Sequence, residues 1–310
     1  MEPKIDLLFS TNWTDYELLD SGEGQKLERF GSYTFIRPEV QSLWRKSLPM
    51  KKWQAAHAIF QPSGEESGGH WQFTKKIPEK WEMGYSLNRN GESGGVEIHF
   101  SVMTTPGRHL GVFPECAVQW DWMENLIRLR GQSPGKDSHE IRVLNLFGYT
   151  GLATLAAASA GAMVTHVDAS RKSVNWAREN QVLSRLEDKP VRWIVDDARK
   201  FVEREARRGA KYDGIILDPP KFGRGPKGEV WEVYRSLPEL LQACRRVLSD
   251  QPLFVVLTIY AVKLPAINAY STLEEMMKNS GGKLECGELV TREKSAGRIL
   301  SQAVYARWKE

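Results

Sequence analysis

The sequence has few cysteines for its 310 residues, and they form no recognisable pattern. Cys116, Cys244 and Cys286 are odd in number and far apart, so they fit neither a disulfide framework nor the close spacing of a zinc site. Unpaired, infrequent cysteines are typical of proteins from a reducing compartment. The sequence therefore favours a cytoplasmic protein, and it predicts neither a metal site nor a disulfide network.

Long apolar runs and a secretory signal are also missing. No stretch approaches the ~20 apolar residues that a membrane helix needs, and the first residues include Glu2 and Asp6, unlike a signal peptide. The formal net charge is only +4, and 41% of the residues are hydrophobic. This composition predicts a globular protein without a membrane span. Its mildly basic charge permits a polyanionic partner but does not establish one.

Two regions of different character are present instead. Residues 1 to about 105 contain short apolar or alternating runs at 33–36, 58–60, 71–73 and 96–102, separated by clusters of Gly, Ser, Asn and Pro. This pattern is typical of short strands and turns. Glycine-rich stretches at 63–69 and 88–95 are expected to be exposed loops. The sequence thus predicts a smaller β-rich N-terminal domain over residues 1–105, followed by a second domain over 106–310.

In the second region, helices and strands alternate. After a helix ending near Gly131 and a linker at 133–138, strands are predicted at 141–146, 163–167, 191–195, 212–217 and 253–258. Helices are predicted at 152–160, 170–183, 198–208, 237–247 and 272–279, and closing strands at 284–290 and 299–308. Largely apolar, β-branched strands alternating with helices indicate an α/β fold with a Rossmann-like parallel sheet covered on both faces.

The first of these strands runs directly into a glycine turn, NLFGYTG at 145–151, and then into a helix. In an open α/β sheet, ligands bind beyond the carboxyl ends of the strands. Glycines let the backbone approach a ligand closely, and the helix start offers free N–H groups to an anion, here a carboxylate. The residues expected to contact a cofactor at this turn are Asn145, Phe147, Gly148, Thr150 and Gly151.

Acidic residues follow at the ends of the next two strands. Asp168 ends the second strand, where a carboxylate can accept hydrogen bonds from both hydroxyls of a ribose. Asp197 follows the third strand, where it can meet an adenine amino group. A nicotinamide-binding domain also places an acid after strand two, but it requires Gly-x-Gly-x-x-Gly, which the turn lacks. Together these signals predict an S-adenosylmethionine site and a methyltransferase.

The fourth strand ends in DPPKF at 218–222. Two consecutive prolines stiffen the backbone and remove two N–H donors, which leaves carbonyl acceptors. Asp218, Pro219 and Pro220 are therefore expected to hold the amino or ring N–H group of a base, and Phe222 to stack on that base. The alternative is a stiff loop in which Asp218 caps a helix.

Basic residues follow in the same loop. Lys221, Arg224 and Lys227 would contact the phosphates of a nucleic-acid substrate; a solvated loop explains them equally well. Methyl transfer is an in-line displacement that depends on alignment and electrostatics more than on an acid–base relay. The lack of a Ser/His/Asp set therefore does not count against an enzyme.

These motifs together resemble a known family. VLNLFGYTG at 143–151, Asp168, Asp197 and DPPKF at 218–222 are similar to the class I S-adenosylmethionine-dependent methyltransferases of the large-subunit ribosomal RNA type, which include cytosine-C5 and guanine-N7 enzymes. The resemblance covers roughly residues 105–310, and DSGEGQKLERFG at 20–31 looks like the opening of the N-terminal domain in one bacterial branch. It implies ribosomal RNA as substrate and cofactor contacts from Phe113, Glu115 and Asp218.

One departure from the family bears on the reaction. The cytosine-C5 enzymes carry a nucleophilic cysteine just after strand five, whereas LTIYA at 257–261 has none. Cys244 lies in an apolar helical row, where a core role is expected, and Cys116 and Cys286 are no better placed. The sequence therefore favours methylation of a base nitrogen, with Tyr260 in the substrate pocket. Methylation of a small molecule or protein side chain, and a non-catalytic cofactor-binding protein, are the alternatives.

Overall fold

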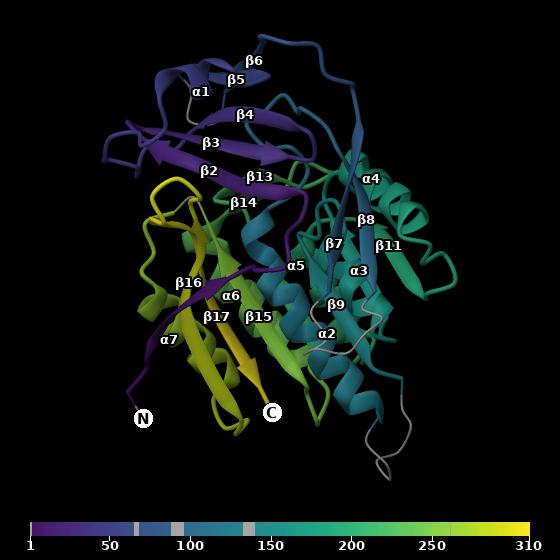
Figure 1. The fold of residues 1–310 in the computed structure, drawn as a ribbon. Coiled ribbons are helices and arrows are strands. Elements are labelled where there is room, and N and C mark those ends of the chain that lie inside the picture. The colour runs from purple at the N-terminus through teal and green to yellow at the C-terminus, as the bar shows by residue number, and fades with distance from the viewer. Residues whose placement is uncertain (1, 65–67, 88–95, 133–139, 261) are drawn as a thin grey trace.

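An eight-stranded sheet forms the centre of the computed structural model, which describes residues 2–64, 68–87, 96–132, 140–260 and 262–310 (Figure 1). The loop predicted at 88–95, the linker predicted at 133–138 and part of the loop predicted at 63–69 lie outside the described residues. In sheet order the strands are β1 (Ile5–Phe9), β16 (Lys283–Arg292), β17 (Ile299–Lys309), β15 (Phe254–Ile259), β12 (Gly214–Leu217), β9 (Arg142–Leu146), β10 (Met163–Asp168) and β11 (Val191–Val195).

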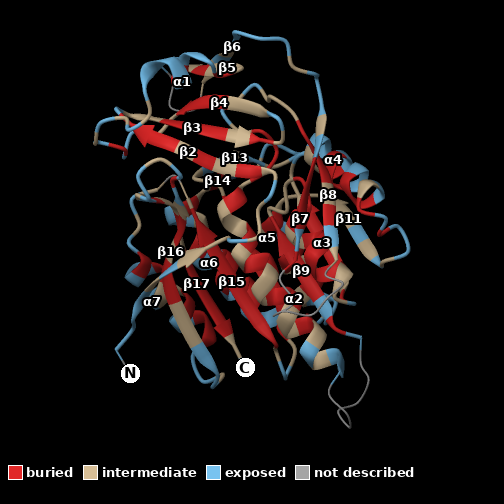
Figure 2. Ribbon diagram, in the orientation of Figure 1, coloured by how far each residue is buried: buried red, intermediate tan, exposed pale blue. Residues whose placement is uncertain are grey.

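The neighbouring strands β11, β10, β9, β12 and β15 are parallel to one another. Strand β17 pairs antiparallel with both β15 and β16. This is the Rossmann-like sheet that the sequence predicts. Every residue of β12 and β15 is buried, as expected for continuous apolar runs in strands covered on both faces (Figure 2). All five parallel strands therefore end at one edge of the sheet, where the glycine turn begins.

Helices cover both faces of the sheet. Apolar residues of α2 (Ala117–Gln132) and α3 (Leu152–Ser159) share one buried cluster with the sheet, and α4 (Arg171–Leu183) adjoins them. A second cluster joins the sheet to α5 (Ala198–Arg207), α6 (Val233–Val247) and α7 (Ala266–Met277). Ser170 caps α4, as predicted, by accepting a hydrogen bond from the Ser173 N–H at 3.2 Å.

Three segments differ from the sequence expectation. Helix α6 begins at Val233 instead of 237, because the Glu232 carboxylate caps it by accepting from the N–H groups of Tyr234 and Arg235. Helix α7 spans Ala266–Met277 rather than 272–279. The basic loop after Asp218 is a hairpin of β13 (Phe222–Arg224) and β14 (Val230–Glu232), closed by a hydrogen bond from Gly225 N–H to the Glu229 carbonyl at 2.8 Å.

The β-rich N-terminal part lies over the edge at which the parallel strands end (Figure 1). It contains a five-stranded sheet, helix α1 and a separate hairpin. Strand β1 instead extends the large sheet by pairing with β16, and Phe30 and Phe35 share a buried cluster with Val143. The boundary near residue 105 stays a prediction. The elements are β2 (Tyr16–Gly22), β3 (Gln25–Phe30), β4 (Tyr33–Pro38), α1 (Met50–Gln54), β5 (Ala58–Pro62), β6 (Gly69–Phe73), β7 (Trp81–Ser86) and β8 (Glu97–Val102).

The β-rich N-terminal part thus forms a cover over the edge of the large sheet, and a buried ion pair lies within this cover. Glu28 on β3 accepts two hydrogen bonds of 2.7 Å from the Arg37 guanidinium on β4. Burial alone would raise the pKa of Glu28, but the positive charges of Arg37 and Lys26 outweigh it and hold the pKa at about 2. Lys26 also donates to the Gln302 side chain on β17 at 2.6 Å. The charged cluster therefore connects the N-terminal sheet to the large sheet.

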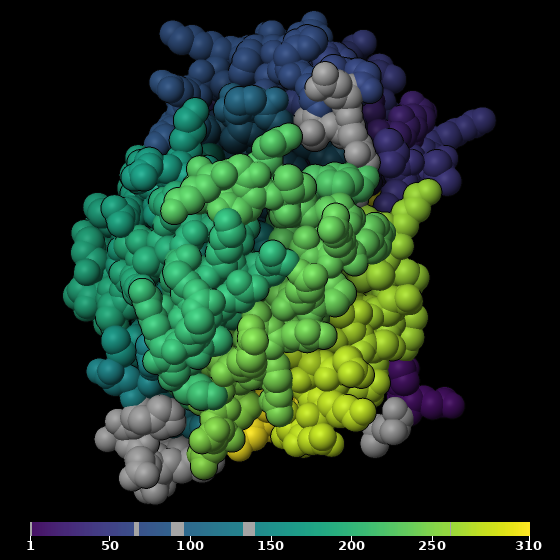
Figure 3. Space-filling model, turned by 180° about the vertical axis from the view of Figure 1, so that it is seen from behind, coloured from purple at the N-terminus to yellow at the C-terminus, as the bar shows by residue number. Residues whose placement is uncertain are grey.

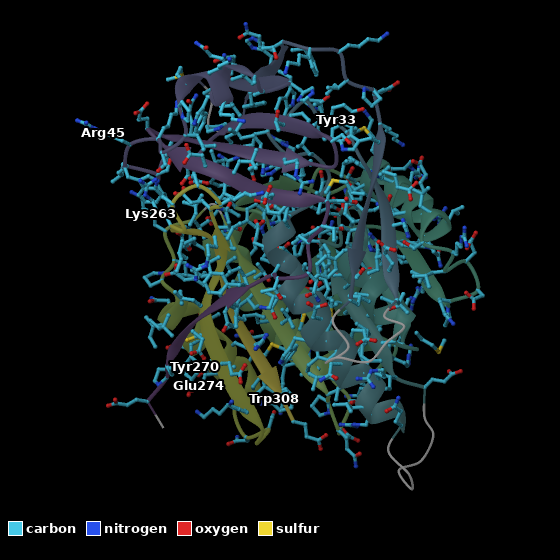
Figure 4. All side chains as sticks on the ribbon, viewed as in Figure 1. Tyr33, Arg45, Lys263, Tyr270, Glu274 and Trp308 are labelled. Atoms are coloured by element: carbon cyan, nitrogen blue, oxygen red, sulfur yellow. The ribbon has the colours of Figure 1, made fainter. Side chains whose placement is uncertain are left out.

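The turn between β16 and β17 binds the same cover. Ser21 Oγ donates to the Glu293 carboxylate at 2.5 Å, and Ser295 Oγ donates to Asp20 at 2.6 Å. Trp308, near the end of β17, lies at the far end of the molecule from Tyr33 and Arg45 of this cover (Figure 4). Within the described ranges, no helix is long and apolar enough to cross a membrane.

Arg37→Met is expected to lower the free energy of unfolding by about 3–5 kcal/mol, because it leaves the buried Glu28 carboxylate without the guanidinium that donates two hydrogen bonds to it. Glu28→Gln/Arg37→Met removes both charges and should recover most of that loss. Urea denaturation at neutral pH measures both. A double variant no more stable than the single one would show that the isolated charge is not the cause.

Candidate active site

Two adjoining cavities lie at the carboxyl edge of the sheet. The larger has a volume of about 330 Å³ and reaches Asp168 and Asp197; the smaller, about 60 Å³, lies against α2 and the start of α3. In the view from behind, a hollow separates the blue N-terminal part from the green segment that carries β13 and β14 (Figure 3). Four residues line both cavities, namely Phe113, Phe147, Tyr149 and Asp218.

The glycine turn is tightly enclosed. A Cβ on Gly148 would lie 2.4 Å from the His166 ring, so this position needs glycine for space. Gly151 has a φ of +85°, and its Cβ would lie 2.7 Å from that of Ala177. Phe147 and Tyr149 have φ values of 58° and 48°, which residues with side chains rarely adopt. Surrounding contacts must therefore hold this backbone in place.

Buried hydrogen bonds supply that support. Asn145 Nδ2 donates to Thr154 Oγ1 at 2.8 Å, and Thr154 Oγ1 lies 2.9 Å from His166 Nδ1. Thr150 Oγ1 donates to the Gly111 carbonyl at 2.7 Å. Asn145 and Thr150 thus line the smaller cavity while also fixing the turn. Burial lowers the pKa of His166 to about 3, so its ring stays neutral.

The acids at the ends of β10 and β11, namely Asp168, Asp196 and Asp197, line the larger cavity. Asp168 accepts hydrogen bonds from the N–H groups of Tyr149 at 2.9 Å and Ser170 at 2.8 Å. Each of its oxygens retains a second lone pair, which a ribose hydroxyl can use. Asp197 also caps α5 by accepting from Lys200 N–H at 2.9 Å.

Asp218 occupies the wall between the cavities. Its Oδ1 is buried and has no hydrogen-bond partner among the described residues. Burial, and then the negative charge of Glu115, raises the pKa of Asp218 to about 7. Burial likewise raises the pKa of Glu115, which lines neither cavity, whereas Phe113 lines both. The centre of the site is therefore an acidic group whose charge changes near neutral pH.

The segment after Asp218 is fixed over the turn. Trp231 donates its indole N–H to the Pro220 carbonyl at 2.7 Å, and its ring centroid lies 4.8 Å from that of Phe147. Pro220 lines the larger cavity, whereas Pro219 is buried and lines neither cavity, so the role of its carbonyl toward a substrate stays a prediction. Arg224 lines the larger cavity, and Lys227 is exposed at the hairpin turn.

Phe222 is 56% exposed on the same hairpin, outside the cavity lining, and the Lys221 ammonium lies 5.2 Å from its ring centroid. Aromatic rings gather inside the larger cavity instead. The centroid of Phe113 lies 5.8 Å from that of Tyr149 and 5.4 Å from that of Tyr260. Tyr260 thus lines the larger cavity, and its contact with a substrate stays a prediction. Phe222 is available to a substrate that approaches from outside.

Helix α2 and the 3₁₀ turn that precedes it, Pro114–Cys116, bring residues into the site that the sequence reasoning missed. Cys116, given no role from its position in the sequence, lines the smaller cavity with Gln119, Trp120 and Met123. Their spacing of three or four residues places them on one helical face, but the sequence does not show which face covers the turn. The pKa of the Cys116 thiol is raised well above its usual value by burial, and then by Asp218 and Glu115.

Known proteins share this architecture. A family model of S-adenosylmethionine-dependent methyltransferases matches residues 119–279. A crystal structure of an S-adenosylmethionine-dependent methyltransferase from Agrobacterium tumefaciens is 44% identical, with a TM-score of 0.88, and the match covers 98% of this chain and 93% of that one. A Streptococcus mutans protein assigned to the same enzymes has the same fold, with a TM-score of 0.68, 17% identity and coverage of 97% and 76%.

Curated relatives match over a shorter region. The ribosomal RNA large subunit methyltransferase K/L of Shewanella sp. (strain ANA-3) is 38% identical over 125 residues, which is 39% of this chain and 18% of that protein. The same enzyme of Shewanella frigidimarina is 38% identical over 109 residues, covering 34% and 15%. This chain therefore spans less than a fifth of the length of these relatives.

Asp168→Ala is expected to raise the Kd of S-adenosylhomocysteine at least tenfold, because the variant loses a charged hydrogen-bond acceptor at the ribose position. Titration calorimetry measures the Kd, and Asp188→Ala, at an exposed carboxylate away from the cavities, is the control. Unchanged binding in Asp168→Ala, with the fold intact, would contradict the assignment.

Proposed function

Because the chain belongs to the S-adenosylmethionine-dependent methyltransferases, we propose that it transfers the methyl group of this cofactor to a nitrogen atom of a base in RNA, ribosomal RNA in particular. The motifs at 143–151 and 218–222 and the K/L relatives support an RNA substrate. The sparse, unpaired cysteines favour the cytoplasm as the place of reaction.

The residues present fit the cofactor. Asp168 and Asp197 line the larger cavity, where we propose that Asp197 meets the adenine and Asp168 the ribose; the start of α3 lines the smaller cavity and favours a carboxylate. The unpartnered Oδ1 of Asp218 lies where the two cavities meet, and a positive charge there would be stabilised by the carboxylate once it ionises. Bound at this site, the cofactor supplies an activated methyl group.

The protonation state of the Cys116 thiol is the main support for a nitrogen atom as the methylation target. Methylation at C5 of cytosine needs a thiolate to attack the ring. Cys116 is the cysteine that lines the active-site cavity, yet burial and its acidic neighbours raise its thiol pKa, which keeps it protonated. Cys244 and Cys286 are buried in α6 and β16. A base nitrogen is already nucleophilic and needs no such activation.

Asp218 and the Pro219 carbonyl then hold the target. As a carboxylate, Asp218 accepts a hydrogen bond from an amino or ring N–H group of the base and can take the proton released after methyl transfer. This arrangement aligns the nitrogen with the methyl group, which is the main requirement of an in-line displacement. Tyr260 and Phe113 supply ring surfaces in the same cavity.

The RNA chain is proposed to reach the cavity over the β13–β14 hairpin. Phe222 on the hairpin and Tyr234 in the first turn of α6 are exposed, at 56% and 55%, and Arg224 and Lys227 add positive charge. Exposed rings beside cations suit unpaired bases and their phosphates. Arg45 of the N-terminal part and Lys263, near the large sheet, are exposed on the left of the view in Figure 4. Positive charge therefore lies on both parts of the molecule.

Methyl transfer from labelled cofactor to RNA from a strain without this gene, followed by nucleoside analysis, is expected to yield a product methylated at a base nitrogen. Cys116→Ser should retain at least half of the activity, because the thiol forms no bond to the base. A C5-methylated product, or loss of activity in Cys116→Ser, would overturn the nitrogen assignment. Labelling of small molecules or protein but not RNA would favour the alternative substrates.

The kcat/KM for the cofactor is expected to rise with pH through about 7 and then level off, because Asp218 accepts the base N–H only when ionised and its pKa in the ligand-free protein is about 7. Asp218→Asn should abolish this step and lower kcat/KM by roughly a hundredfold. Glu115→Gln removes the charge that raises the Asp218 pKa and should move the midpoint to lower pH. A flat pH profile in the unmodified protein would contradict the role of Asp218. Cys116 and Tyr260 also face it, but burial raises the pKa of each.

A further inference from the structure

The smaller cavity contains a fixed hydrogen-bond donor that neither the motifs nor the comparisons assign. Gln119, on α2, is only 4% exposed and lines this cavity. Its Nε2 is buried and has no hydrogen-bond partner within the described ranges. A buried amide without a partner costs about 1–3 kcal/mol of free energy, so its position needs an explanation.

Neighbouring charges fix the direction in which this amide points. Arg307 Nη1 lies 3.2 Å from Gln119 Oε1. A guanidinium only donates hydrogen bonds, so the amide atom facing it must be the oxygen, and the NH₂ group must face the other way. Arg307 is itself held by the Glu285 carboxylate, at 3.0 Å from Nε and 2.9 Å from Nη2. Side chains of the neighbouring strands β16 and β17 therefore orient a side chain of α2.

Arg307 has little freedom to move. It is 8% exposed, and its guanidinium carbon lies 4.6 Å from the ring centroid of Trp122 and 5.4 Å from that of Tyr305. Planar guanidinium groups stack well on such rings. The pair of Glu285 and Arg307 thus forms a rigid support behind Gln119.

The other walls of the cavity indicate what the amide binds. Leu152 and Ala153, in the first turn of α3, line it, and the N-cap residue of this helix is Gly151, which has no side chain to bond the free N–H groups. This positive helix end favours an anion. Asp218, with its unpartnered Oδ1, offers an acceptor to the same space. One neutral donor, a helix N-terminus and a carboxyl acceptor complement an amino acid, which carries both a carboxylate and an ammonium group.

The size of the cavity agrees with this ligand. A single water needs about 10–15 Å³ by the measure used for such cavities, so about 60 Å³ holds the end of a short polar chain but not a base or a ribose. The larger cavity, with Asp168 and Asp197, takes the adenosyl part.

We propose that Gln119, oriented by Arg307 and Glu285, donates a hydrogen bond to the carboxylate of the cofactor's amino-acid tail, while the ammonium group of the tail faces Asp218. This assignment rests on cofactor binding in the site of the proposed function, but not on the identity of the methylated substrate.

The chain offers a matched control in Gln302. Its Oε1 also accepts from a cation, Lys26 Nζ at 2.6 Å, and its Nε2 is likewise without a partner among the described residues. Gln302 lies outside the linings of both cavities. Replacement of either glutamine by leucine removes the same amide, but only one of them should affect the ligand.

Titration calorimetry on the full chain should compare S-adenosylhomocysteine, which has the tail, with 5′-methylthioadenosine, which has the adenosyl part and no tail. Gln119→Leu is expected to raise the Kd of S-adenosylhomocysteine roughly tenfold to a hundredfold, as for a lost hydrogen bond to a charged group, and to leave that of 5′-methylthioadenosine within twofold. Gln302→Leu should change neither.

Gln119→Glu keeps the acceptor for Arg307, and therefore the local fold, while it presents a carboxylate to the carboxylate of the tail. Gln119→Glu should raise the Kd of S-adenosylhomocysteine more than Gln119→Leu does, again without effect on the Kd of 5′-methylthioadenosine. Arg307→Met, which frees the Gln119 amide to rotate, should raise the Kd of S-adenosylhomocysteine less than the Gln119 variants do. It should leave the Kd of 5′-methylthioadenosine unchanged. Thermal denaturation shows that each variant is folded.

The assignment would be overturned if the Gln119 variants lost affinity equally for both ligands, or if both variants bound S-adenosylhomocysteine with unchanged affinity. Failure of the proposed function has a different signature. If the protein binds S-adenosylhomocysteine through Gln119 but methylates no RNA, the assignment of this subsite holds and only the proposed RNA substrate is wrong.

Discussion

The close approach of Gly148 to the His166 ring is the constraint on which the site depends. No side chain fits between them, so β9 and β10 are held together where the chain leaves the sheet. Phe147 and Tyr149 are then forced to positive φ values on either side. The strain is offset by the Asn145–Thr154–His166 hydrogen bonds and by Trp231 against Phe147. The ligand site is thus preorganised by side chains beneath it, while the N–H groups of Gly148, Tyr149 and Gly151 are themselves hydrogen-bonded within the protein.

Acidic charge is concentrated where a cationic cofactor is expected. Asp168, Asp197 and Asp218 line the larger cavity, and burial raises the pKa values of Asp168 and Asp218. A bound sulfonium would favour their ionised forms, and loss of its charge on methyl transfer would reverse that effect. Burial, and then the negative charge of Asp218 and Glu115, raises the pKa of Cys116 and keeps its thiol protonated. One arrangement of charge therefore favours the cofactor over its product and opposes thiolate chemistry.

The N-terminal part completes the site from above. The segment from Thr105 to Phe113 forms the wall opposite the glycine turn, and its conformation depends on the sheet of β2–β6 through the bond from Arg37 to the Arg108 carbonyl, 3.2 Å long. The Glu28–Arg37 pair in turn connects through Lys26 to β17. The cover and the large sheet are therefore joined by both charged contacts and a shared apolar core, which suits a site formed between them.

Local sequence alone determined the alternation of strands and helices, the turn at 145–151 and the acids at the strand ends, because periodicity, glycines and capping residues act within a few positions. It did not reveal β1, the β13–β14 hairpin or the early start of α7, since partners distant in sequence decide those elements. The roles of Cys116, Gln119 and Arg307 were equally hidden. Their chemistry arises only when α2, β16 and β17 meet at the glycine turn, and tertiary packing alone brings residues so far apart in the chain to one cavity.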